Sequence, residues 1–238
     1  MTDITGIEAF DEVKRLIVIA AHADDLETMC GGTIALLAQR GVTIFSVNCT
    51  LGDIGAQEKE TSRWTLAATR IAEAEDAAEI LGIEQTYNLS RPDGELVADL
   101  ELRAQIARLY RLTQADSLLT FDPYWTGQAH PDHRAAGQVA LDAYMPSKMP
   151  LYRPEHLNET GAALGKIERV FLFQASPEPE IYVDVTDVYD TKMAACRAHV
   201  SQFPKGDDSL KWMNELDQGR GEKIGVTYAE AFKSMRVW

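Results

Sequence analysis

The sequence predicts an α/β fold in which a mostly parallel sheet is flanked by helices, and three observations support this class. Short apolar runs alternate with segments of helical period as far as about residue 145, as expected when strands and crossover helices follow one another. Further strand-like runs come after that region. The chain has 238 residues, 45% of them hydrophobic, which is enough for one sizeable core. We therefore expect one domain over residues 1–238.

The first half of the chain contains the clearest elements. An apolar run at 15–21 predicts a buried strand, and a glycine pair soon after it opens a helix that leads to a second strand at 42–50. Apolar residues then recur at spacings of three and four, which predicts an amphipathic helix over 62–81 that Gly82 ends. A short strand at 86–90 completes this half.

The second half follows the same alternation less regularly. We expect a helix that starts near His133, and Thr186 or Asp187 is the expected cap of a later helix that runs to Phe203. The glycine- and charge-rich segment 204–226 is expected to be a mobile loop over a site. The remaining expected elements are a helix at 99–114 and strands at 117–123, 169–175 and 181–186.

Charge and composition exclude several classes of partner. The formal net charge is −14, which disfavours binding to nucleic acid or anionic membranes. No apolar run approaches the roughly 18 residues of a membrane span, and the first 16 residues lack the pattern of a signal peptide. Cys30, Cys49 and Cys196 are scattered, which is typical of buried free thiols rather than of disulfides. We expect a cytoplasmic protein that binds neither nucleic acid nor membranes.

Two short motifs carry residues suited to catalysis. AHADDLE (21–27) follows the first predicted strand, and HPDH (130–133) follows the strand at 117–123. In an open parallel sheet, ligands bind beyond the carboxyl ends of the strands, so these two loops can share one pocket. Three of the five histidines lie in these loops, each close to aspartate. We therefore expect a single site made by both loops.

The residues of these loops fit a metal-assisted hydrolase. His22, Asp25 and His133 are the candidate ligands of Zn²⁺, which in catalytic sites commonly takes three protein ligands and a water. Asp24 then fits a general base, and His130 fits an acid or the partner of an oxyanion. Asp132 is expected to accept a hydrogen bond from His130 and to fix its tautomer.

Other interpretations stay open on the residues alone. Taken singly, His22 and Asp25 could form a surface pair or a cap, and the later motif could be a turn that begins a helix. Two histidines and a carboxylate also form the facial triad of non-haem iron oxygenases. A nucleotide-binding loop is a weaker alternative, because the loop lacks GxGxxG and its two aspartates would repel a pyrophosphate.

The two motifs, taken with their order and spacing, resemble those of the LmbE-like or PIG-L-type zinc deacetylases. Further similar segments cover nearly the whole chain: CTLGDIG (49–55), TRIAEAEDAAEILGI (69–83), NLSRPDGEL (88–96), HVSQF (199–203) and GVTYAEAF (225–232). The resemblance implies a Rossmann-like fold and zinc at His22, Asp25 and His133, and Fe²⁺ can also occupy a site of this type. It also implies Asp24 as the base and His130 as the acid or oxyanion partner.

The resemblance further implies a small N-acetylglucosaminide as substrate. The chain looks most like short bacterial members, including enzymes that act on N-acetylglucosaminyl malate, although inositol glycosides and chito-oligosaccharides also fit. Substrate contacts would fall on Arg70, Asp93 and Arg169. By chemistry alone, Arg70 could instead pair with Glu73 one helical turn later, and Asp93 could be a plain turn residue. Members of the family often form trimers or hexamers, so a homo-oligomer is expected.

Overall fold

A computed structural model of the chain describes residues 6–56, 58–173 and 179–237, and contains a seven-stranded sheet. The strand order is β3-β2-β1-β4-β5-β7-β6, in which β1 to β5 run parallel and β7 runs antiparallel to both of its neighbours. The expected mostly parallel α/β class is therefore confirmed. The strands are β1 (Arg15–Ala20), β2 (Thr43–Thr50), β3 (Gln85–Arg91), β4 (Ser117–Phe121), β5 (Arg169–Phe173), β6 (Ile181–Asp184) and β7 (Ala229–Arg236).

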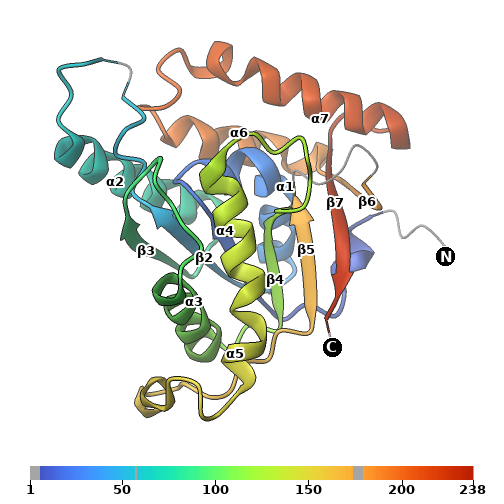
Figure 1. Ribbon diagram of the computed structural model, residues 1–238. Coiled ribbons are helices and arrows are strands. Elements are labelled where there is room, and N and C mark those ends of the chain that lie inside the picture. The colour runs from blue at the N-terminus through green and yellow to red at the C-terminus, as the bar shows by residue number, and fades with distance from the viewer. Residues whose placement is uncertain (1–5, 57, 174–178, 238) are drawn as a thin grey trace.

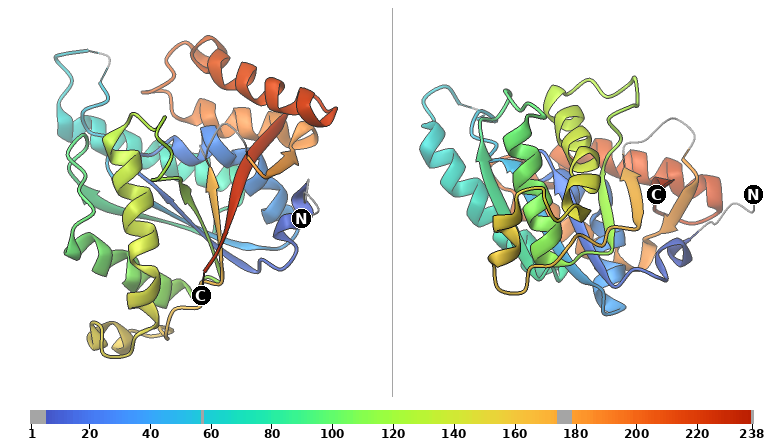
Figure 2. Two further views of the ribbon diagram at one scale, coloured as in Figure 1. Left: turned by 45° about the vertical axis from the view of Figure 1, so that its right-hand side comes forward. Right: turned by 60° about the horizontal axis from the view of Figure 1, so that its bottom comes forward.

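Helices pack against the sheet in two groups (Figures 1 and 2). One group consists of α1, α2 and α6, which contact one another, and the other of α3, α4 and α5. The last helix, α7, packs against β7. The helices are α1 (Asp25–Gln39), α2 (Arg63–Leu81), α3 (Leu100–Thr113), α4 (Pro131–Asp142), α5 (Tyr144–Lys148), α6 (Tyr189–Ala198) and α7 (Lys211–Ile224), with short 3-10 helices at Ile7–Phe10, Pro154–Asn158, Thr186–Val188 and Gly206–Leu210.

The core forms where the sequence is most apolar. Strand β1 lies inside the sheet between β2 and β4, and its residues from Leu16 to Ala20 are buried on both faces, as expected for a parallel strand covered by two helix layers. Helix α2 ends where Gly82 adopts a positive φ of 75°. Helix α3 begins where Asp99 accepts a hydrogen bond from the backbone N–H of Leu102. Local sequence signals therefore define the framework.

Two expectations about the C-terminal region are wrong. The predicted mobile loop 204–226 is mostly helical, because it contains the 3-10 helix at 206–210 and α7. The helix expected to run from a cap at Thr186 or Asp187 to Phe203 instead begins at Tyr189, without a side-chain cap, and ends at Ala198. Tertiary packing holds α7 in place: at Gly221 a side chain would lie 2.7 Å from the carbonyl oxygens of Val226 and Thr227, so glycine permits this contact. Residues 174 and 175 of the expected fifth strand lie outside the described residues.

None of the helices described for this chain is long and apolar enough to cross a membrane.

Candidate active site

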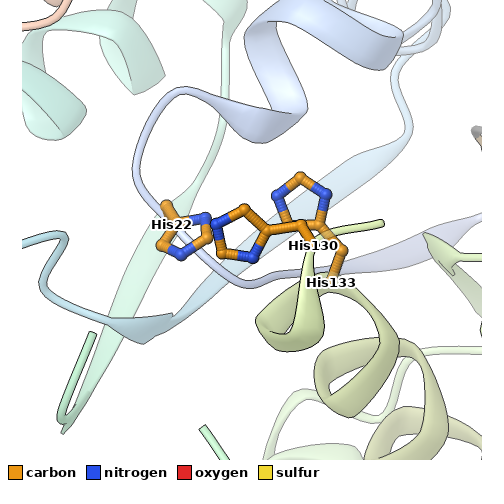
Figure 3. Close-up of side chains that lie close together, drawn as sticks. All are labelled: His22, His130 and His133. Atoms are coloured by element: carbon orange, nitrogen blue, oxygen red, sulfur yellow. The ribbon is translucent and has the colours of Figure 1, made fainter. Parts of the chain in front are cut away.

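The candidate site lies at the carboxyl edge of the parallel strands, where the loops after β1 and β4 meet. His22 follows β1, whereas His130 and His133 lie at the start of α4, and Figure 3 shows the three imidazole rings side by side. They surround a cavity of about 440 Å³. The expected convergence of the two loops is thus observed. The cavity is lined by His22, Asp24, Asp25, Ile54, Gly55, Arg70, Asp93, Gly94, His130, His133 and Gln202.

Asp25 joins the histidines of the two loops. One carboxylate oxygen lies 3.4 Å from Nδ1 of His22, and the other lies 3.2 Å from Nε2 of His133. The backbone N–H groups of Ala21 and His22 also donate to Asp25, at 3.0 and 2.8 Å. Burial would raise the pKa of Asp25, but His133 and His22 outweigh it and hold the pKa well below its usual range. The three side chains predicted as ligands therefore form one group, in which His22 and Asp25 are buried and His133 is partly exposed.

His22 has carboxylates on both sides of its ring. Its Nε2 lies 3.0 Å from Asp93 and 3.4 Å from Asp132, opposite the contact between Nδ1 and Asp25. Burial alone would lower the pKa of His22, yet Asp25 and Asp93 raise it to about 11. The surrounding groups therefore stabilise a positive charge at this position.

The donor set suits a divalent metal ion. Ring nitrogens of His22, His130 and His133 lie within 4.8 Å of one another, and so do donor atoms of His22, Asp93 and Asp132. Nδ1 of His133 is buried without a hydrogen-bond partner. Imidazole and carboxylate donors are common ligands of Zn²⁺ and Fe²⁺ in catalytic sites. The site therefore contains a candidate metal group, and these neighbouring donors extend beyond the three residues predicted as ligands.

Asp24 has an unusual backbone conformation. Its φ of 115° and ψ of −20° lie in a region that residues with a side chain rarely adopt. Although Asp24 precedes α1, its side chain makes no capping hydrogen bond and instead lies 3.2 Å from Nη2 of Arg70. Burial raises the pKa of Asp24 to about 6 against the opposing effect of Arg70. The carboxylate is therefore directed into the cavity and has the pKa range of a general base.

Arg70 is buried beside the carboxylate of Asp24. Its guanidinium is 3% exposed and donates to the backbone carbonyls of Ala23 and Gly52 as well as pairing with Asp24. The alternative pair with Glu73 is not formed, because Glu73 accepts hydrogen bonds from the backbone N–H and hydroxyl of Ser201. The position favours a role in orienting Asp24, although Arg70 also lines the cavity.

The expected contact between the carboxylate of Asp132 and His130 is wrong. Nδ1 of His130 accepts from the backbone N–H of Asp132 at 3.2 Å, in the manner of a helix cap. The carboxylate of Asp132 is fully buried and accepts from the backbone N–H groups of Gly94 and Leu96. A neutral His130 that accepts at Nδ1 carries its proton on Nε2. Asp132 therefore fixes the tautomer through its backbone, and its side chain anchors the 94–96 turn beside His22.

The structure brings one of the two remaining predicted contacts to the site. Asp93 is buried beside His22 and accepts from the backbone N–H of Ile54 at 3.3 Å. Burial would raise the pKa of Asp93, but His22 lowers it. Arg169 lies elsewhere: it starts β5 opposite Ser117, at the amino edge of the sheet, and pairs with Glu12. Residues at the amino edge of parallel strands face away from the cavity.

Sequence reasoning did not single out residues that follow α6. Gln202 lines the cavity and donates to the carbonyl of Gly55 at 3.2 Å. His199 is fully buried and lies 3.3 Å from Glu27 in the first turn of α1. No local spacing marks either residue, and the similarity of HVSQF to a family segment was the available signal.

Comparisons with known proteins agree with this geometry. The sequence model of the family described as "PIG-L: GlcNAc-PI de-N-acetylase" matches residues 17–144. The chain is 32% identical to the diacetylchitobiose deacetylase of Thermococcus kodakarensis, over 95% of this chain and 85% of that protein. A solved structure of the N,N'-diacetylchitobiose deacetylase from Pyrococcus horikoshii superposes with a TM-score of 0.88 at 32% identity, again covering 95% of this chain and 85% of that one.

One similar protein has a different reaction in its name. The 4-oxalmesaconate hydratase of Pseudomonas putida is 29% identical, over 93% of this chain and 89% of that protein. Similar proteins therefore include both deacetylases and a hydratase by name. The residues of the site must decide between these reactions.

Proposed function

This chain belongs to the GlcNAc-PI de-N-acetylase (PIG-L) family, and on that premise we propose that it is a metal-dependent hydrolase that removes the N-acetyl group from a small N-acetylglucosamine-containing substrate. The observation that carries the proposal is the position of Asp24 beside the group formed by His22, Asp25 and His133. A carboxylate base beside residues that can hold a metal ion suits the hydrolysis of an amide by a metal-activated water.

The residues of the site have separate roles in this proposal. His22, Asp25 and His133 would hold the metal, for which Zn²⁺ is favoured and Fe²⁺ is the alternative. When bound there, such an ion polarises the amide carbonyl and lowers the pKa of a coordinated water. Asp24 accepts the proton of the attacking water, and Arg70 orients its carboxylate. His130 donates from Nε2 to the developing oxyanion or to the departing amine.

The hydratase relative supports a second candidate function, in which the same base would direct water to a carbon–carbon double bond. The substrate of such an enzyme carries several carboxylates and needs cations to bind them. Both terminal nitrogens of Arg70 are already bonded to Asp24 or backbone carbonyls, and Asp24, Asp25 and Asp93 line the same cavity. This charge distribution favours the neutral amide.

The experiment is to measure acetate release by protein stripped of metal and then restored with Zn²⁺ or Fe²⁺. The substrates are N-acetylglucosamine, its malate and inositol glycosides, and diacetylchitobiose. We expect release that requires metal. Absence of release from all of them, with metal bound stoichiometrically, would overturn the proposed substrate class. Hydration of an unsaturated dicarboxylate would then support the second candidate, and oxygen uptake with Fe²⁺ would indicate an oxygenase.

A further inference from the structure

A second cavity of about 660 Å³ lies on the same edge of the sheet as the candidate active site. Its wall comes from the loop that joins β4 to α4, from the end of β5 and from β7, and Figure 1 shows that loop rising beside the end of β5. The volume is within the range of about 300–1,000 Å³ found for small-molecule sites. The residues that decide its chemistry are Asp122, Tyr124, Trp125 and Lys233.

This aromatic cavity, as we call it, is linked to the catalytic cavity through one short segment. Gly127 lines the aromatic cavity and His130 lines the catalytic one, so two residues, or at most about 11 Å of extended chain from Gly127 to His130, separate their walls. Gln128 lies within this segment and is buried. The two cavities are thus neighbouring parts of one loop surface.

The hydrogen bonds of Gln128 fix this segment. Its backbone N–H donates to the carbonyl oxygen of Trp125 at 3.0 Å, and its side-chain oxygen accepts from the backbone N–H of His130 at 3.3 Å. A side chain at Gly127 would lie 2.4 Å from the indole of Trp125, so the indole sits directly against the backbone there. Gln128 therefore holds the backbone of Trp125 in a fixed place relative to His130, through hydrogen bonds that do not involve the indole.

The lining of the aromatic cavity suits a pyranose ring. The C–H face of a sugar is apolar and packs on aromatic rings such as those of Tyr124 and Trp125. The sugar's hydroxyl groups can donate to the carboxylate of Asp122 and accept from the ammonium of Lys233. Asp122 is buried and held in place, because it accepts from the backbone N–H of Tyr124 at 2.9 Å. Aromatic rings flanked by one carboxylate, from Asp122, and one ammonium, from Lys233, match an uncharged polyol.

We propose that the aromatic cavity is a second sugar subsite, which takes the uncharged pyranose ring attached to the N-acetylglucosamine that is hydrolysed. This inference rests on the proposed function and deepens it, because it favours a disaccharide over a glycoside with an anionic aglycone. A malate group carries two carboxylates, whereas Lys233 is the one cation among the described residues that line the aromatic cavity, Asp122 lies in the same wall, and the chain carries a net charge of −14.

The first test compares the kinetics of the Trp125→Ala variant on two substrates. We expect KM for diacetylchitobiose to rise about tenfold, while kcat/KM for N-acetylglucosamine changes less than twofold. Trp125→Phe keeps an aromatic face and should restore most of the affinity. Trp212→Ala, in α7 and outside both cavities, is the matched control and should leave both substrates unchanged. Equal losses on both substrates, or no loss on either, would overturn the subsite.

The second test does not require turnover. Calorimetry measures how the wild-type protein and Trp125→Ala bind chitobiose and glucosamine, neither of which has an acetyl group to lose. Weaker binding of chitobiose alone supports the subsite, even if the protein releases no acetate and the proposed function fails. Unchanged binding of chitobiose overturns the subsite, even if deacetylation is observed.

Discussion

The buried charges around His22 differ from a second buried group, the Lys192 cluster of Lys192, Asp217 and Glu230. In the Lys192 cluster the ammonium lies 2.6 Å from Asp217 and 2.8 Å from Glu230, and all three side chains are fully buried. Around His22, the described ion pairs of Asp25, Asp93 and Asp132 are with imidazoles rather than with lysine or arginine.

The difference teaches how each group balances its charge. Burial would lower the pKa of Lys192, but Glu230 and Asp217 raise it, so the lysine stays charged. It joins α6, α7 and β7, and Glu230 also accepts from the backbone N–H groups of Gly32 and Thr33 in α1. An imidazole nitrogen, unlike a lysine ammonium, can coordinate a metal ion in place of its proton, so a bound cation can supply the positive charge that the carboxylates around His22 stabilise. The Lys192 cluster therefore stabilises the fold, whereas the residues around His22 are suited to binding a metal ion.

Removal of metal should produce the largest loss of activity, and it should act on the residues around His22 and not on the Lys192 cluster. We expect chelation to reduce acetate release at least about 1,000-fold, because a bound ion supplies several kcal/mol of transition-state stabilisation. The melting temperature should also fall, since a ligand bound at 100 times its Kd stabilises the native state by about 2.7 kcal/mol. Activity and calorimetry before and after addition of Zn²⁺ measure both. Full activity after complete removal of metal would contradict the assignment of the residues around His22 as a metal site.

Lys192→Met should destabilise the fold without affecting the metal. Loss of the ammonium leaves Glu230 buried without a cation and leaves Asp217 with Arg220 alone, which costs about 3–5 kcal/mol of unfolding free energy. Urea unfolding measures this change, and metal content per chain should stay the same. The control is Lys211→Met, whose side chain is exposed and whose effect should be within about 0.5 kcal/mol. A loss of metal with unchanged stability would reverse the assignment of the two groups.

Asp24→Ala should separate catalysis from metal binding within the site. We expect turnover to fall by at least about 100-fold, the usual contribution of a general base, while the metal content is retained. Steady-state kinetics and metal analysis of the same preparation give both values. Near-normal turnover would exclude Asp24 as the base.

The smallest effect concerns the pair of His199 and Glu27, which uses an imidazole instead of a lysine. Burial would lower the pKa of His199, but Glu27 and then Asp24 raise it. Its stabilisation is therefore complete below the ordinary histidine pKa of about 6.5, and is lost as the pH rises through the folded-state pKa. We expect His199→Gln to cost about 1.5 kcal/mol at low pH.

Urea unfolding at several pH values between about 6 and 9 tests this dependence. The stability difference between wild type and His199→Gln should shrink as the pH rises. The corresponding difference for Lys192→Met should stay constant over the same range, because the raised pKa of Lys192 lies above it. A constant difference for both variants would show that the two pairs behave alike.

Local signals explain what could be predicted from the sequence. The apolar run of β1 and the glycine after α2 define their elements without help from distant residues. The meeting of His22 with His133 was predictable because parallel strands end at one edge of the sheet. The position of α7 was not, because Asp217 depends on Lys192 and Gly221 depends on a close backbone contact. The carboxylate of Asp132 likewise binds a turn that no local spacing connects to it.

The backbone of Asp24 has a consequence for evolution and for engineering. A residue with a side chain at a φ of 115° costs about 1–3 kcal/mol, whereas glycine adopts this conformation freely. Selection for heat resistance alone would therefore enrich glycine at this position and discard the catalytic carboxylate. A screen that scores both survival of heating and acetate release would keep the aspartate, so the choice of screen determines whether a stabilised descendant is still an enzyme.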